Sequence, residues 1–161
     1  MAKPVTERMV VLDHVIARLE LIAGGDDWNL DLRKLKEKVH RKVTAIETIT
    51  PDQLPYLAVF ATEGAVRPGM GGWYDGDFNI EVIGLMKDDE HRFRGIPADV
   101  GVEMLLADVR KTITAAVQEP TTQCYTKQPW PIEKDFDEEL GRWSLFRLTI
   151  PWIYPQAQRG R

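Results

Sequence analysis

The sequence predicts an α+β domain in which a small, mostly antiparallel sheet carries helices packed on one face. Three observations support this prediction. Apolar residues recur every three or four positions in several segments, as in amphipathic helices. Two segments in the second half alternate apolar and polar residues, as in half-buried strands. A short apolar run between prolines and glycines adds another strand, and only the last pair of strands is separated by a helix.

Three helices are expected. The first runs from about Thr6, as N-cap, to Ala23, before a Gly-Gly pair, with a stripe of Met9, Leu12, Ile16 and Leu19. The second covers the basic segment LDLRKLKEKVHRKV, with Leu32, Leu35, Val39 and Val43 on one face, although its β-branched end also allows a strand. The third runs from a capping Asp99 to about Val117, with a buried stripe of Val102, Leu105, Leu106, Val109 and Ile113.

Three strands are expected as well. YLAVFA follows a turn framed by two prolines and predicts a short buried strand. DFNIEVIGLM predicts a strand with one face formed by Phe78, Ile80, Val82 and Met86. RWSLFRLTIPWIYP predicts a terminal strand with one face formed by Phe146, Leu148, Ile150, Trp152 and Tyr154. Because proline cannot donate to a ladder, Pro151 predicts that this strand lies at a sheet edge or contains a bulge. Its other face and unpaired edge could receive a partner.

Composition predicts one domain over residues 1–161, with loops at 64–77 and 118–141. A content of 43% hydrophobic and 29% charged residues is typical of globular proteins, and a net charge of −4 is too small to indicate a nucleic-acid binder. Cys124 is the only cysteine, so no intrachain disulfide is expected. No apolar run approaches the roughly 18 residues of a membrane helix, and the first residues do not resemble a secretory signal.

No catalytic or metal-binding pattern is visible. His14, His40 and His91 have no metal-ligand spacing and are expected at the surface, and Cys124 has no base beside it. The glycine-rich segment RPGMGGWYDGD leads into a strand instead of opening a helix, so it does not predict a phosphate site. The basic segment 33–42 is expected to be solvated. The sequence therefore predicts no enzyme, cofactor or metal.

Aromatic residues in the glycine-rich segment suggest a contact surface instead. Met70, Trp73 and Tyr74 lie among glycines that allow the segment to change shape. Large aromatic side chains on such a loop are costly unless something covers them. Either a partner covers them, or Trp73 packs back over the domain core.

The order of these segments resembles the tail terminator proteins of long-tailed bacteriophages over residues 6 to 155. The segments that carry the resemblance are VLDHVIARLELI, KVHRKV, LPYLAVF, FNIEVIGLM, VEMLLADVRKTI and RWSLFRLTIPWIYP. Its best part is the helix LLADVRKTI, followed after a loop by an alternating strand that ends in an aromatic residue. The segments 64–77 and 118–141 have no match in the family.

The resemblance implies a structural protein without enzymatic activity or cofactor. Such proteins are similar in closing into six-membered rings that cap the tail tube, end its polymerisation and meet the head–tail connector. DNA passes through the lumen without sequence recognition. The implied partners are further copies of the chain, the major tail tube protein and the connector, and the implied location is the virion neck after assembly in the host cytoplasm. The implied interface residues are Met70, Trp73, Tyr74, Asp135, Asp137, Glu138, Glu139, Trp152 and Tyr154.

Several alternatives remain open at this stage. The acidic run 135–139 could contact neighbours or the tube, or face the lumen and repel DNA. Another virion neck or tail-completion protein would show similar features. A small bacterial ligand-binding domain would use Trp73, Tyr74 and Trp130 to line a pocket, and an enzyme with an unrecognised site is a further class.

Overall fold

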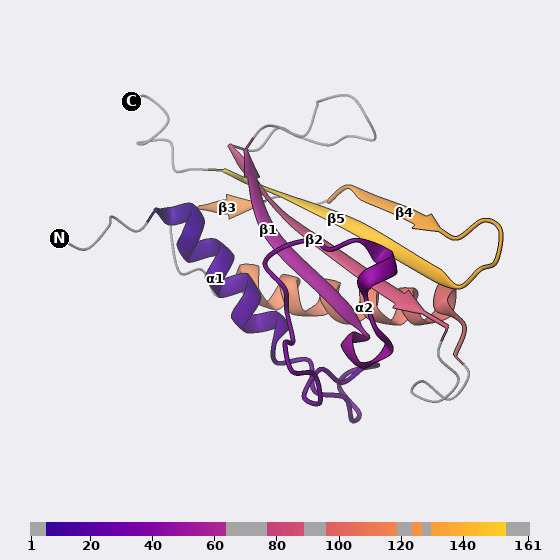
Figure 1. Cartoon of the computed structure of the whole chain (residues 1–161). Helices are drawn as coiled ribbons and strands as arrows, with labels where there is room; N and C mark the ends of the chain where they lie inside the picture. Colours follow the sequence, from indigo (N-terminus) through magenta and orange to yellow (C-terminus); the bar gives the residue numbers. More distant parts are fainter. Residues whose placement is uncertain (1–5, 64–76, 89–95, 119–123, 127–129, 154–161) are drawn as a thin grey trace.

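The computed structural model describes residues 6–63, 77–88, 96–118, 124–126 and 130–153 (Figure 1). These residues form an open, five-stranded antiparallel sheet with two α-helices packed on one face, which confirms the predicted α+β class. The helices are α1 (Glu7–Leu19) and α2 (Ala98–Gln118). The strands are β1 (Tyr56–Glu63), β2 (Phe78–Lys87), β3 (Tyr125–Thr126), β4 (Ile132–Phe136) and β5 (Trp143–Ile153). Two short 3₁₀ helices, η1 (Ile46–Thr48) and η2 (Pro51–Gln53), precede β1.

The core lies between the helices and one face of the sheet. The predicted apolar faces of β2 and β5 are buried there, with Phe146, Leu148, Ile150 and Trp152 at most 5% exposed. The predicted stripe of α2 is buried against them. Gly84 of β2 lies opposite Phe146 of β5, and the phenylalanine ring occupies the space that a side chain at position 84 would need.

The two helices begin at different kinds of cap. Thr6 caps α1 as predicted, since its Oγ1 accepts the Met9 backbone N–H at 3.3 Å. For α2, the predicted cap Asp99 lies inside the first turn instead. Asp88, at the end of β2, accepts the Ala98 N–H at 2.6 Å. The carboxylate that satisfies the start of α2 therefore comes from the residue that directly follows β2.

The predicted second helix is wrong. Leu32, Leu35 and Val39 are buried as its stripe requires, but the backbone of this segment bonds to other elements. His40 donates its N–H to the Leu57 carbonyl at 2.8 Å and accepts the Val59 N–H at 2.7 Å, which forms a parallel bridge beside β1. A backbone that bonds to a sheet edge cannot also form the i to i−4 bonds of a helix.

The predicted position of the terminal strand is also wrong. β5 pairs with β2 on one side and with β4 and β3, one after the other, on the opposite side. Thr149 donates its N–H to Pro131 on the β4 side, and alternation turns the nitrogen of Pro151 to that same side. There, Pro151 falls between the last residue paired with β4, Leu148, and the first paired with β3, Trp152. A central strand tolerates this proline because the missing donor faces a break between partner strands.

The predicted loop 118–141 is only partly a loop. It contains β3 and β4, each paired with β5, and the turn that joins β4 to β5. The sequence of β4 does not show the alternation of apolar and polar residues that predicts a strand, because both of its faces are largely exposed and polar. The predicted loop 64–77 lies outside the described residues apart from Asp77.

Candidate assembly surface

The second face of the sheet is partly covered by residues 37–53, which we call the strap. Figure 1 shows this segment crossing the sheet on the side opposite α2. Beneath it lies a second, smaller apolar cluster formed by Ile49, Leu54, Tyr56, Ala58 and Leu85. This part of the sheet is therefore covered by the strap and not by a helix.

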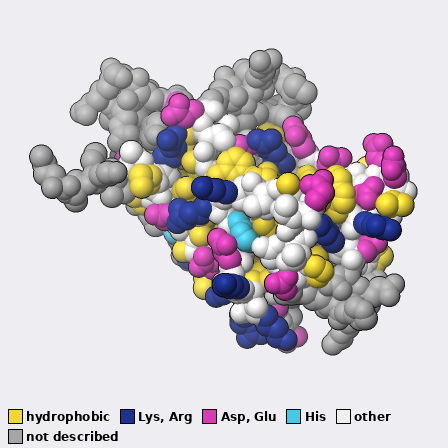
Figure 2. Space-filling view, viewed as in Figure 1, with side chains coloured by type: hydrophobic (Ala, Val, Ile, Leu, Met, Phe, Trp, Pro, Cys, Tyr) yellow, Lys and Arg dark blue, Asp and Glu magenta, His cyan; other side chains and the backbone are white. Residues whose placement is uncertain are grey.

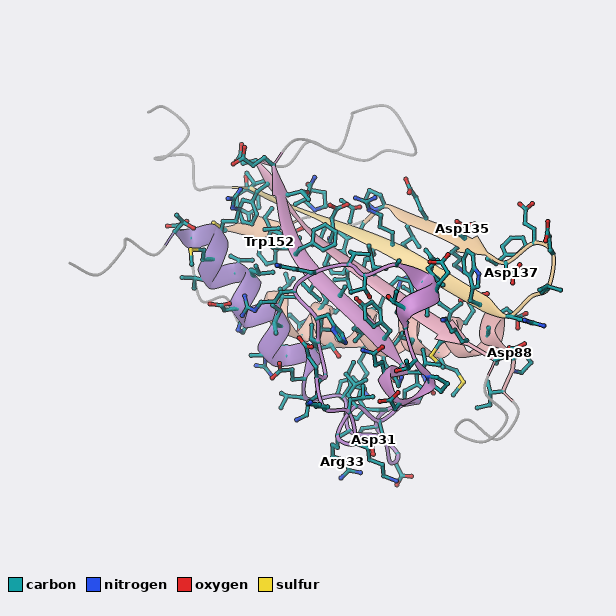
Figure 3. The ribbon with its side chains drawn as sticks, viewed as in Figure 1. Asp31, Arg33, Asp88, Asp135, Asp137 and Trp152 are labelled. Carbon is teal, nitrogen blue, oxygen red and sulfur yellow. The ribbon has the colours of Figure 1, made fainter. Side chains whose placement is uncertain are left out.

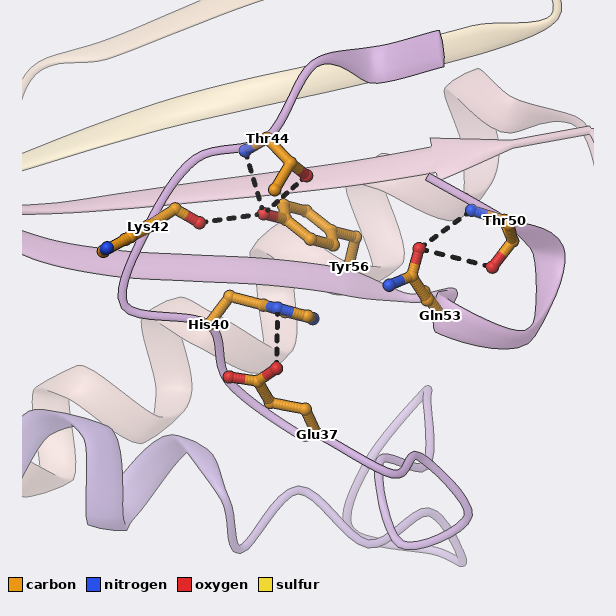
Figure 4. Close-up of polar contacts among 7 residues, drawn as sticks. All are labelled: Glu37, His40, Lys42, Thr44, Thr50, Gln53 and Tyr56. Carbon is orange, nitrogen blue, oxygen red and sulfur yellow. Dashed lines mark hydrogen bonds and ion pairs between the residues drawn. The ribbon is translucent and has the colours of Figure 1, made fainter. Parts of the chain in front are cut away.

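Tyr56 attaches the strap to β1 (Figure 4). Its hydroxyl donates to the Lys42 carbonyl at 3.0 Å and lies 3.3 Å from both the backbone nitrogen and the hydroxyl of Thr44. The ring stacks on His40 with centroids 4.4 Å apart, and His40 Nδ1 lies 3.2 Å from Glu37. The surface position predicted for His40 is wrong, because its side chain is only 12% exposed.

Lys87 attaches the other end of the strap. Its Nζ donates to the carbonyls of Ile46 and Ile49 at 2.6 and 2.8 Å. Both carbonyls belong to the turn around η1, and the Ile46 carbonyl also accepts the Ile49 N–H at 3.2 Å. A cation from the end of β2 thus fixes the conformation of a segment some forty residues earlier.

Between the strap and β4, the sheet face remains open. A hollow of about 430 Å³ lies there. It has an apolar floor and a charged rim that are formed by Val43, Ile46, Ile83, Leu145, Glu133, Lys134, Asp135 and Arg147. Arg147 donates from Nε to Glu81 at 2.6 Å across the β2–β5 pair, and the Glu81 side chain is only 7% exposed. This pair compensates the buried carboxylate on the open face.

The β4–β5 hairpin projects beyond this hollow. Asp137 shapes its turn, because its Oδ1 accepts the N–H groups of Glu139 and Leu140 at 3.2 Å. Gly141 adopts a φ of +63°, which the chain needs to return into β5. Two apolar side chains, Phe136 and Leu140, are 56% and 62% exposed at this end. Exposed apolar side chains at a projecting turn are typical of a contact surface.

Opposite charges gather at two separate places on the molecule. Acidic side chains cover the hairpin, and basic ones gather on the loop that holds Arg33 (Figures 2 and 3). No ion pair neutralises Glu133, Asp135, Asp137, Glu138 or Glu139 within the part of the chain that the structure describes. Lys134 of β4 forms an ion pair with Glu103 of α2.

A buried carboxylate holds the loop that leads to the basic segment. Asp108 of α2 accepts the backbone N–H groups of Asn29 and Leu30 at 3.0 and 2.9 Å. Burial raises the pKa of Asp108 above its ordinary value, although these N–H donors offset part of the rise. Nearby, Lys111 lies over the Trp28 ring at 4.6 Å. The loop is thus fixed against α2 while the basic residues that follow it are exposed.

The residues predicted for the interface divide into three groups. Asp135, Asp137, Glu138 and Glu139 come together on the hairpin. Trp152 is 5% exposed and belongs to the core of a single chain, so it is not a surface residue. Met70, Trp73, Tyr74 and Tyr154 lie outside the described residues, as does His91. Sequence reasoning missed the exposed Phe136 and Leu140, whose signal was two apolar residues inside an acidic run.

Reactive side chains in the described part of the chain have structural partners. The thiol of Cys124 is buried and donates to Glu7 at 3.0 Å. His14 Nε2 lies 3.1 Å from the Ala116 carbonyl and links α1 to α2, so it too is not a free surface histidine. Trp130 packs against the main core and donates from Nε1 to Thr126 at 3.2 Å. Across these described ranges, no three His, Cys, Asp or Glu residues are grouped to hold a metal ion.

The fold and its surfaces define a class: an open-faced α+β domain with a projecting, acidic hairpin. Neither of the two described helices combines the length and the apolar character that crossing a bilayer requires. Comparison with protein-family models and with curated protein sequences finds no match for this chain.

Proposed function

We propose that this protein is a structural component of a bacteriophage tail that forms a ring on the end of the tail tube. The ring ends polymerisation of the tube and joins it to the head connector. The observation that carries the proposal is the β4–β5 hairpin, with exposed Phe136 and Leu140 among acids that lack ion-pair partners in the described structure. Such a surface suits contact with another protein. The order of helices and strands that resembles tail terminators supports the same function.

In this function, the chain acts by binding alone. A ring needs two different surfaces on each subunit, one for each neighbour. It also needs an apolar contact to the tube beneath, for which Met70, Trp73 and Tyr74 remain the candidates from sequence. DNA would pass through the lumen without base recognition, and the net charge of −4 would disfavour its adhesion to the protein.

The test is to add the purified protein to growing tail tubes and to measure tube length by electron microscopy. The wild-type chain should give tubes of limited length with a ring of six subunits at one end. The variant Phe136→Ser/Leu140→Ser should remain folded and fail to cap, because it removes the exposed apolar side chains of the hairpin. Val100→Ser, which changes a 48% exposed residue on α2, is the matched control and should cap normally.

Other outcomes would redirect the assignment. A ring of another copy number, or binding only to the connector, would indicate a different neck or tail-completion protein. Normal capping by the hairpin variant would remove the hairpin from the mechanism. Complete indifference of the wild-type chain to tubes would contradict the proposal and favour a ligand-binding domain.

A further inference from the structure

The hairpin and the basic segment are complementary in charge. Residues 133–139 contain five acids and one lysine, a formal charge of −4. Residues 33–42 contain six Lys or Arg and one Glu, a formal charge of +5. Two of these cations are already paired, Arg33 with Asp31 at 2.8 Å and Arg41 with Asp13 at 2.7 Å. Lys34, Lys36 and Lys42 are exposed and form no ion pair with any described residue.

The basic segment also offers a place for an apolar side chain. A hollow of about 540 Å³ lies between it and η2, lined by Leu35, Lys36, Glu37, His40, Asp52 and Gln53. The segment is held firmly, since Leu35 and Val39 are buried beneath it and His40 is bonded to β1. The charged residues that line the hollow are Lys36, Glu37 and Asp52, so the attraction for carboxylates comes from the exposed lysines of the segment beside it. The hollow itself offers room for an exposed aromatic side chain such as that of Phe136.

The two surfaces lie on different sides of one chain. Figure 3 places Asp135 and Asp137 at one end of the sheet and Arg33 on the separate lower loop. They therefore remain exposed within a single subunit and are available to other copies. Two hairpins would repel each other, as would two basic segments, because each carries charge of one sign. Charge thus disfavours a symmetric pairing of like surfaces and favours a head-to-tail contact.

We infer that the β4–β5 hairpin of one copy docks on residues 33–42 of the next, with Phe136 and Leu140 as apolar anchors and the lysines pairing with the hairpin acids. This inference rests on the proposed ring and identifies the subunit contact within it. The contact is heterologous, so repetition closes a ring or extends a filament. The hairpin acids then face a neighbouring subunit and not the lumen.

The experiment uses two charge-reversed chains. The first, Glu133→Lys/Asp135→Lys/Glu138→Lys/Glu139→Lys, has a basic hairpin, with the formal charge of residues 133–139 changed from −4 to +4, and the native basic segment. The second, Lys34→Glu/Lys36→Glu/Lys42→Glu, has an acidic segment, with the formal charge of residues 33–42 changed from +5 to −1, and the native acidic hairpin. Association of the full-length chains is measured by sedimentation at millimolar protein and low salt, and tube capping is scored in parallel. Each variant alone should lose about tenfold or more in association, because reversal turns several modest attractions into repulsions.

An equimolar mixture of the two variants is the decisive sample. Each basic hairpin then meets an acidic segment and each acidic hairpin meets a basic one, so association should return to the wild-type level in alternating order. A contact between like surfaces, or one elsewhere on the chain, would give no such rescue. As a control, the ion pair of Arg8 and Glu63, which lies outside both surfaces, can be exchanged, which should leave association unchanged.

The outcomes separate this inference from the proposed function. Rescue in the mixture without capping of tubes by the wild type retains the contact and rejects the tail role. Capping by the wild type and by each single variant retains the tail role and rejects the contact. A wild-type chain that neither associates nor caps rejects both. If the reversals of Lys34, Lys36 and Lys42 abolish binding to duplex DNA while association persists, the basic segment is a phosphate contact and the inference is overturned.

Discussion

Replacing Gly84 by alanine tests how tightly the sheet packs on α2. A Cβ at this position would lie 2.2 Å from Cε1 and 2.5 Å from Cζ of Phe146, and 2.9 Å from a methyl group of Leu105. Neither neighbour can move away freely, because both side chains are fully buried. The new methyl group must therefore displace the phenylalanine ring or separate β2 from β5.

The expected loss can be worked out from two opposing effects. Overpacking a dense core costs about 1–3 kcal/mol, and an approach of 2.2 Å belongs at the upper end of that range. Alanine also restricts the unfolded chain, and this effect offsets about 0.5–1 kcal/mol of the loss in stability. We expect Gly84→Ala to lower the free energy of unfolding by about 2 kcal/mol.

Urea denaturation of a double-mutant cycle measures this effect. Phe146→Leu removes the ring atoms that the methyl group meets, so the double variant should be more stable than additivity predicts by about 1 kcal/mol or more. Gly25→Ala is the control, since Gly25 has a φ of +76° and a Cβ added there would meet no heavy atom within 4 Å. Its cost comes from backbone strain alone and should add to that of Phe146→Leu. A neutral Gly84→Ala, or full additivity with Phe146→Leu, would refute this account of the packing.

Three further predictions concern the attachments described above. Tyr56→Phe should lower the free energy of unfolding by about 1–2 kcal/mol, because it leaves the Lys42 carbonyl without its donor; denaturation that matches the wild type would contradict this. Lys87→Met should accelerate amide hydrogen exchange around η1, where the Ile46 and Ile49 carbonyls each lose the lysine as a donor, while exchange in α1 stays unchanged; equal exchange in wild type and variant would exclude the attachment. For Asp108, the raised pKa means that the native state binds a proton more tightly than the unfolded chain, so its contribution to stability falls as pH rises from 3.8 through the raised value. Asp108→Asn should remove that fall, which denaturation of the wild type and the variant at several pH values would measure. A difference in unfolding free energy between the two proteins that does not change with pH would contradict the prediction.

The parts of the fold that the sequence predicted are those in which local pattern and tertiary packing agree. The alternation in β2 and β5 and the stripe of α2 each place one apolar face toward a core, and the core formed there. The helix predicted over residues 30–43 failed because the apolar residues of this segment have helical spacing while its backbone bonds elsewhere. Leu30 donates to Asp108 of α2, and His40 bonds to β1. The sequence of the segment itself does not indicate these distant hydrogen-bond partners.

The candidate surface was only partly predictable for a related reason. An acidic run predicts exposure, so Asp135 and its neighbours were placed correctly on the outside. An apolar residue in such a run, such as Phe136, can turn inward or outward with the same local pattern. Conversely, alternation in β5 shows that Trp152 is covered but not whether its own chain or a partner covers it. In each case the answer depends on which strands flank β5.

The position of β5 has a mechanical consequence. This strand runs without interruption from the root of the hairpin to the end of the sheet beside β3, and it pairs with β2 over the full length of β2. A pull on the hairpin along the strand axis loads all those ladder bonds together in shear. A sideways pull on β4 would instead open its shorter ladder one bond at a time, starting at the exposed edge. The domain is therefore stiff in one direction and compliant in the other, and force applied at the hairpin along β5 reaches the centre of the core directly.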